Sequence, residues 1–216
     1  MAEQQNILVI LGHPAADSLC AGMARAYADG AQQAGAKVRF LDVGQLAFNP
    51  LFQGYGAAQP LEPDLLAAQA DITWAHHLVW VYPIWWGAMP ALLKGFIDRV
   101  LLPGYAFKYR KGSSLWDKLL AGRSAELLVT MDSPPWYFRW VTRMPGHHQM
   151  KKAILEFCGI APVRTHSFGP VRTASAEQLA LWVHKTRQLG QRQGGRAAPG
   201  KPRAAPVTSS ASSPLP

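Results

Sequence analysis

A pair of tryptophans, Trp85-Trp86, stands where a buried strand is expected to meet a helix. The apolar run at 78–82 stops at Pro83, and the pair and a glycine come before the next helical pattern. Open α/β sheets bind ligands just beyond the carboxyl ends of their strands. The pair therefore indicates a flat, π-rich ligand. Plain packing, in the core or between subunits, is the alternative for each tryptophan.

A second segment, residues 12–20, has the residue types of an anion-binding loop. It follows the first apolar run and contains His13 and Ser18 before a helical pattern. The first N–H groups of a helix lack intrahelical partners and the helix dipole favours negative charge, so a phosphate fits there. Neither the P-loop pattern nor GxGxxG occurs, which excludes a P-loop NTPase and a standard dinucleotide-binding site. The simpler alternative is a helix cap at Ser18 and an ordinary loop histidine at position 13.

The elements that must position these segments alternate between strand and helix. Strands are predicted at residues 6–11, 37–42, 77–82, 125–131 and 163–168. Helices are predicted at 18–34, 64–75, 89–100, 146–158 and 175–191, with Pro90 in the first turn of the third. Five such repeats favour a parallel sheet with helices on both faces and right-handed crossovers. The most hydrophobic strand, 77–82, is predicted at the sheet centre, and the alternating strand 37–42 near an edge.

Three intervening segments are predicted to be irregular. Residues 44–63 form a loop rich in Gly and Pro, and residues 132–145 an aromatic, proline-rich loop. Residues 101–122 form a long excursion with a short helical turn near 115–120.

The two candidate segments are expected to meet. In a doubly wound sheet, the ends of the first and third strands flank the point where the strand order reverses. An anion loop at one end and an aromatic surface at the other fit a flavin better than a bare sugar phosphate. Backbone N–H groups after Pro83 are expected to hydrogen-bond the polar edge of the ring and to stabilise charge as it is reduced.

Length and charge limit the class of protein. The 216 residues fit one domain, placed at 1–192, and the Gly-, Ala-, Pro- and Ser-rich segment 193–216 is predicted to be a disordered basic tail. The net charge of +9 comes without a helix-turn-helix, zinc or RNA-binding motif, so no nucleic-acid partner is expected. A mildly basic body suits an enzyme that takes up a phosphorylated dinucleotide.

The sequence also predicts a cytoplasmic location. No apolar run reaches the ~18 residues of a membrane span, and the N-terminus has the pattern of a first strand rather than a signal peptide. Cys20 and Cys158 lie far apart in no metal-type spacing, so free thiols in a reducing compartment are expected. No cluster of Cys, His and acidic residues predicts a metal site.

Taken together, the motifs of the chain resemble those of a known family. They are His13-Pro14 with Asp17-Ser18 and the segments 83–87, 90–95, 98–100, 104–107 and 157–159. In consistent order from about residue 6 to 190, they resemble the NAD(P)H:quinone oxidoreductase family of flavodoxin-like flavoenzymes. That family includes bacterial quinone reductases and potassium-efflux ancillary oxidoreductases. The resemblance implies a doubly wound five-stranded parallel sheet in the order 2-1-3-4-5.

The resemblance also implies which residues surround the flavin. Those around its phosphate are His13, Ser18, Leu19 and Cys20. Those flanking the ring are Pro83, Ile84, Trp85 and Trp86, and those lining its other edge are Thr130, Met131, Asp132 and Ser133. The chain departs from the family at two places. Relatives often carry Thr-Thr-Gly-Gly at 130–133, so Asp132 adds a negative charge here, and they often carry asparagine at the position of Cys20.

Two further residues match catalytic groups of the family. Tyr137 and His147 are the candidates for a tyrosine and a histidine that stand over the flavin and handle protons as hydride moves. The alternatives are a packed aromatic residue at 137 and a polar helix start at 147.

The activity implied is a two-electron, ping-pong reaction. NADPH or NADH delivers hydride to flavin N5 and leaves, and a quinone or similar planar aromatic acceptor then binds in the same pocket. FMN is preferred because the chain is short and has no evident adenine-binding segment, and FAD is a close second because residues 44–63 offer a contact for adenosine. In the family the site lies at a homodimer interface. The alternative is an ancillary flavoprotein that docks on a membrane transporter, with its basic tail contacting anionic lipid.

Overall fold

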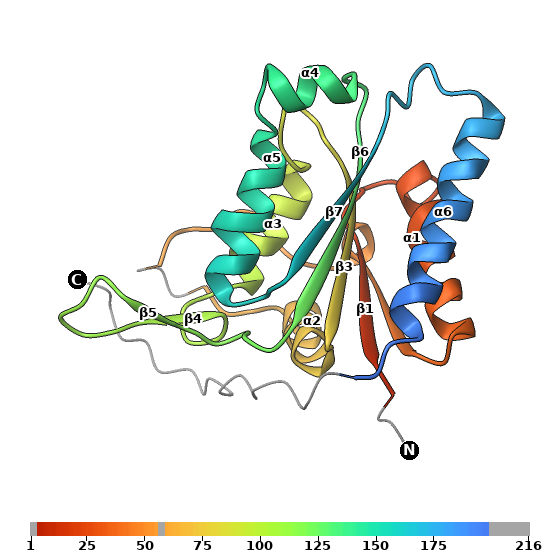
Figure 1. Ribbon diagram of the computed structural model, residues 1–216. Coiled ribbons are helices and arrows are strands. Elements are labelled where there is room, and N and C mark those ends of the chain that lie inside the picture. The colour runs from red at the N-terminus through yellow and green to blue at the C-terminus, as the bar shows by residue number, and fades with distance from the viewer. Residues whose placement is uncertain (1–3, 56–58, 199–216) are drawn as a thin grey trace.

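Five parallel strands form the central sheet, in the order β2-β1-β3-β6-β7 (Figure 1). The computed structural model describes residues 4–55 and 59–198. The strands are β1 (Asn6–Leu11), β2 (Lys37–Asp42), β3 (His77–Pro83), β6 (Ser124–Thr130) and β7 (Val163–Phe168). The predicted order 2-1-3-4-5 is confirmed, because β6 and β7 are the fourth and fifth strands of this sheet.

The burial of the strands follows their sequence patterns. Every residue of β3 is buried, as expected for an apolar strand covered on both faces. In β2 only Leu41 is buried, which fits its place at the sheet edge. The predicted central and edge strands are therefore confirmed.

Helices cover both faces of the sheet (Figure 1). On one face lie α1 (Leu19–Gln33) and α6 (Ala176–Gly194). The other face carries α2 (Pro63–Trp74), α3 (Ala91–Val100), α5 (Pro145–His148) and the π-helical segment Gln149–Glu156 that continues it. A short 3-10 turn spans Val43–Gln45, and α4 (Pro135–Trp140) lies beyond the carboxyl end of the sheet (Figure 1). No helix in the described part of the chain is long and apolar enough to cross a membrane.

Glycines bring α1 and α6 into close contact. A β-carbon at Gly30 of α1 would collide with the carbonyl oxygen of Arg187 on α6. One at Gly190 would likewise collide with the carbonyl oxygen of Tyr27. The two helices therefore pack backbone against backbone, and this contact fixes the position of α1 and of its first turn.

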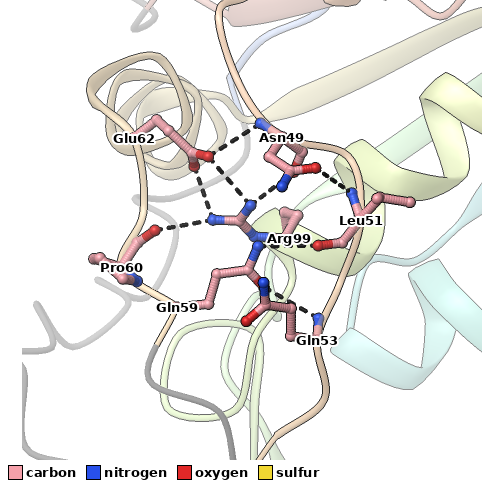
Figure 2. A network of polar contacts seen from close by, with 7 residues as sticks. All are labelled: Asn49, Leu51, Gln53, Gln59, Pro60, Glu62 and Arg99. Carbon is pink, nitrogen blue, oxygen red and sulfur yellow. Dashed lines mark hydrogen bonds and ion pairs between the residues drawn. The ribbon is translucent and has the colours of Figure 1, made fainter.

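An arginine clasp holds the loop before α2 against α3 (Figure 2). The guanidinium of Arg99 is only 1% exposed and donates to the carbonyl oxygens of Asn49 (2.7 Å) and Pro60 (2.9 Å). It also pairs with the Glu62 carboxylate at 2.8 Å, and Glu62 in turn accepts from the Asn49 N–H. Because a buried cation needs such partners, the arginine and the loop depend on each other.

Some predicted elements were wrong or shifted. The third helix begins at Ala91 rather than 89, and Pro90 is its N-cap rather than part of its first turn. The reason is that Ala88 closes a turn with Trp85, and Pro90 keeps Met89 out of the helical region.

The helical turn predicted near 115–120 is instead a hairpin. Strands β4 (Phe107–Tyr109) and β5 (Trp116–Lys118) pair antiparallel. The indole of Trp116 donates to the carbonyl oxygen of Phe157 at 2.9 Å and stacks on its ring at 4.5 Å. A contact between Trp116 and a residue 41 positions away therefore favours the hairpin over a helical turn. The sequence pattern of 115–120 alone does not reveal such a contact.

Two further boundaries differ from the prediction. The loop predicted at 132–145 contains the helix α4, which starts with proline at a position where no N–H is needed. The last helix continues to Gly194, two residues into the predicted tail, and the rest of that prediction falls mainly on 199–216, outside the described residues.

Candidate functional site

A cavity of about 200 Å³ opens where the carboxyl ends of β1, β3 and β6 meet the first turn of α1. Ten of the twelve residues predicted to contact a cofactor line it. They are His13, Ser18, Leu19, Cys20, Pro83, Ile84, Trp85, Thr130, Met131 and Asp132. The structure thus brings together three segments far apart in sequence, at the point where the strand order reverses.

The α1 side of the cavity has the form of an anion site. The Ser18 hydroxyl caps the helix by accepting from the Ala21 N–H at 3.2 Å, and it donates to the Ala15 carbonyl at 2.9 Å. The ring of His13 accepts from the Ala15 N–H at 2.9 Å through Nδ1. This bond assigns the proton of a neutral His13 to Nε2. The loop is thereby fixed in place beside N–H groups at the start of α1 that lack intrahelical partners.

The two tryptophans occupy different environments. Trp85 lines the cavity, is 45% exposed and stands edge-to-face with His13, with ring centroids 5.4 Å apart. Trp86 lies at the tip of a tight turn closed by the Trp85 N–H and the Ala88 carbonyl at 2.9 Å, and its side chain is fully exposed. Trp86 and Gly87 both have positive φ, 52° and 80°, as the central residues of a type I′ turn do. The structure does not bring Trp86 to the cavity.

Three backbone donors at the ends of β3 and β6, beside the cavity, are already in use. The N–H of Ile84 donates to the Thr130 carbonyl at 2.7 Å, and that of Trp85 to Ala88. The Met131 N–H donates to Phe168 at 2.9 Å. These N–H groups hold the sheet and the turn together. The sequence predicted that N–H groups after Pro83 would bind the ring, but the first two, on Ile84 and Trp85, already have protein partners.

A loop that the sequence did not point to closes the far wall. Val171 lines the cavity, and its N–H donates to the Met131 carbonyl at 3.0 Å. A β-carbon at Gly169 would collide with the same carbonyl. The Asp132 carboxylate accepts from the Arg172 N–H at 2.8 Å. The available signal was the Gly169-Pro170 pair directly after the fifth strand, because that strand ends at the same edge of the sheet as the others. Ser133 is not among the lining residues.

Neither proposed catalytic residue lines the cavity. His147 is only 4% exposed, shares a hydrogen bond of 2.9 Å with Ser167 through Nε2, and packs against Phe138. Burial, with a smaller effect from the charge of His148, lowers the pKa of His147 to about 4, so its ring is neutral at pH 7. Tyr137 is exposed on α4, edge-on to Trp136. Within one chain, the structure brings neither side chain to the cavity.

The thiol of Cys20 lies at the floor of the cavity, 3.3 Å from the Thr130 hydroxyl. Burial raises the pKa of Cys20 to about 11 and that of Cys158 to about 12, and neither forms a disulfide. Both thiols stay protonated below these values. We therefore expect neither to react with an aromatic disulfide reagent at neutral pH in the folded protein, and both to react after unfolding. Rapid release of thiolate chromophore from the folded protein would contradict this picture.

A doubly wound sheet with a cavity at the reversal of its strand order defines the class of flavodoxin-like proteins. A sequence model described as a flavodoxin-like fold matches residues 5–189. An uncharacterized NAD(P)H oxidoreductase of Haemophilus influenzae is 30% identical over 172 residues, which are 77% of this chain and 84% of that protein. A ribosyldihydronicotinamide dehydrogenase (quinone) of Rattus norvegicus is 32% identical over 144 residues, which are 60% of this chain and 58% of that protein.

A solved structure gives the same fold. The FMN-dependent NADH-azoreductase of Bacillus anthracis, in complex with FMN, has a TM-score of 0.68 at 16% identity, over 88% of this chain and 99% of that one. The chain therefore belongs to the flavodoxin-like family, among NAD(P)H oxidoreductases. The family resemblance predicted from the motifs is confirmed.

Proposed function

We propose that the protein is an FMN-dependent oxidoreductase that takes hydride from NADPH or NADH and passes it to a quinone or another planar aromatic acceptor. One observation carries the proposal: the cavity has an anion-binding loop on one side and an aromatic surface on the other. The naming of the rat relative as a quinone dehydrogenase and the FMN complex of the Bacillus anthracis enzyme support it.

The donor set of the cavity fits a flavin. The first turn of α1, capped by Ser18, suits its phosphate, because N–H groups without intrahelical partners lie there at the positive end of the helix dipole. Trp85, Ile84 and Met131 provide apolar surface for a flat ring. The flavin, when bound, supplies the hydride chemistry, and the protein supplies orientation and electrostatics.

The residues of the chain would then act by binding and orienting. The first turn of α1 and His13 would hold the phosphate end, and the Nε2–H of His13 is available as a donor. The Ser18 hydroxyl, which donates to Ala15, would keep the loop in place. Trp85 would provide an aromatic surface for the ring and help to exclude water from it. The buried thiol of Cys20 stays protonated and adds no charge beneath the site.

We prefer FMN over FAD because of the Arg99 clasp. It pins the loop between the 3-10 turn and α2 to α3, and no described residue of that loop lines the cavity. The loop is therefore engaged with α3 rather than placed as a wall for an adenosine.

We also propose that the active form is a homodimer. Large aromatic side chains are exposed at the cavity end of the molecule, on the turn at Trp86 and on α4 at Trp136 and Trp140. Exposed aromatic surface of this kind is typical of interfaces. The alternative of docking on a transporter depended on the basic tail, most of which lies outside the described residues.

Steady-state kinetics test the proposed reaction. We expect a soluble benzoquinone to accelerate oxidation of NADPH or NADH by the FMN-loaded protein, with parallel double-reciprocal lines, because donor and acceptor use one site in turn. Oxidation of the nicotinamide that does not depend on the acceptor would contradict the proposal.

A further inference from the structure

We propose that Asp132 lowers the two-electron reduction potential of the flavin by placing a carboxylate in the wall of the cavity. The inference rests on the proposed function, because it requires a flavin in this cavity.

The position of Asp132 follows from the sheet. Thr130 at the end of β6 pairs with Pro83 at the end of β3, so the residues just after each strand face one cavity. Asp132 lies two residues beyond Thr130 and lines that cavity with Ile84 and Trp85. It therefore belongs to the cavity in which a flavin would sit.

The Asp132 carboxylate is held in place by a backbone donor. Its Oδ1 accepts from the backbone N–H of Arg172 at 2.8 Å, which ties it to the loop after β7. Within residues 4–55 and 59–198, Asp132 has no ion pair. A single backbone donor orients a carboxylate without neutralising it.

Three backbone donors at the cavity do not offset this charge. Free N–H groups aimed at a ring would stabilise the negative charge that it gains on reduction. Here the N–H groups of Ile84, Trp85 and Met131 donate to carbonyl groups of the protein. The cavity wall thus presents a carboxylate, whereas the N–H groups of these three residues point toward protein carbonyl groups.

The consequence is electrostatic. Reduction by hydride adds two electrons and one proton to the ring, and a neighbouring negative charge opposes the net gain of negative charge. Asp132 is exposed, so water screens the effect and keeps it moderate. The protein then binds the reduced flavin less tightly relative to the oxidised flavin, which makes the reduced flavin a stronger reductant toward the acceptor.

The test compares Asp132→Asn with Asp29→Asn. The amide of D132N keeps an oxygen for the Arg172 N–H and loses the charge. D29N removes the same charge from α1, eleven residues and about 16 Å along the helix from Ser18, where Asp29 pairs with Arg187 on the surface. Each protein is loaded with FMN and reduced in equilibrium with a reference dye, and its affinity for oxidised FMN is measured separately.

In D132N we expect the ratio of the affinity for reduced FMN to the affinity for oxidised FMN to be roughly three- to tenfold higher than in the unaltered protein. This corresponds to a reduction potential that is about 15–30 mV higher for a two-electron couple. D29N should leave the ratio unchanged. If D132N does not fold, Asp132→Gly, which also removes the charge, should shift the ratio in the same direction. An unchanged ratio in the folded variant, or an equal shift in D29N, would overturn the inference.

The two proposals fail in different ways. If the unaltered protein binds no FMN, the proposed function fails. If it binds FMN and is reduced by NADPH or NADH, but D132N has the same potential, only the role of Asp132 fails.

Discussion

Replacing Trp85 by alanine is expected to weaken FMN binding about 10- to 100-fold, which corresponds to about 1.4–2.7 kcal/mol. The indole lines the cavity and stands against His13, so it is placed to cover a flat ring. Stacking on an aromatic side chain adds to the burial of apolar area, and alanine loses both. Quenching of FMN fluorescence on titration with the protein measures the affinity.

Trp86→Ala is the matched control. It removes the same side chain one residue away, but Trp86 is fully exposed at the tip of the turn and does not line the cavity. We expect its FMN affinity to change by less than about twofold. Equal losses in the two variants would mean that the turn as a whole, rather than Trp85, holds the cofactor, and no loss in either would assign both indoles to packing or an interface.

Gly30→Ala is expected to destabilise the fold by about 2–3 kcal/mol. Its β-carbon would meet the backbone carbonyl of Arg187 on α6, which cannot turn aside as the end of a flexible side chain can. The two helices must therefore separate, and their apolar contacts with the sheet loosen. Urea unfolding followed by far-ultraviolet circular dichroism measures the free energy.

The same substitution at Gly22 should have the opposite sign. Gly22 also lies in α1, but a β-carbon there has nothing within 4 Å. Alanine is the better helix former by about 1 kcal/mol, so Gly22→Ala should stabilise the protein by roughly that amount. If both variants were destabilised alike, the close packing of α1 on α6 would not be the cause.

The strands of the sheet could be predicted well from the sequence. The predicted β1, β2 and β7 have the observed bounds, β3 extends one residue further, and β6 is shifted by one residue at both ends. Short apolar runs between turn residues fix a buried parallel strand locally, because little else can bury such a run. The hairpin of β4 and β5 could not be found in this way, since Trp116 is held by Phe157 from another part of the chain.

The site could be predicted where it follows directly from strand ends. Residues next to the ends of β1, β3 and β6 must meet in this topology, and most of those named do line one cavity. The positions that failed to reach it depend on turn geometry or helix direction. Trp86 is turned outward by positive φ, and His147 is buried against β7 through Ser167. Val171 was missed because its loop reaches the cavity from 40 residues beyond Met131.

The most direct test is whether the purified protein holds a flavin. We expect a yellow protein whose visible spectrum is that of an oxidised flavin, and the cofactor released by unfolding to be FMN, about one per chain. We also expect the colour to bleach on addition of NADPH or NADH and to return with a quinone. A colourless protein that binds no added FMN or FAD would contradict the assignment of the cavity lined by Ser18, Trp85 and Thr130 as a flavin site.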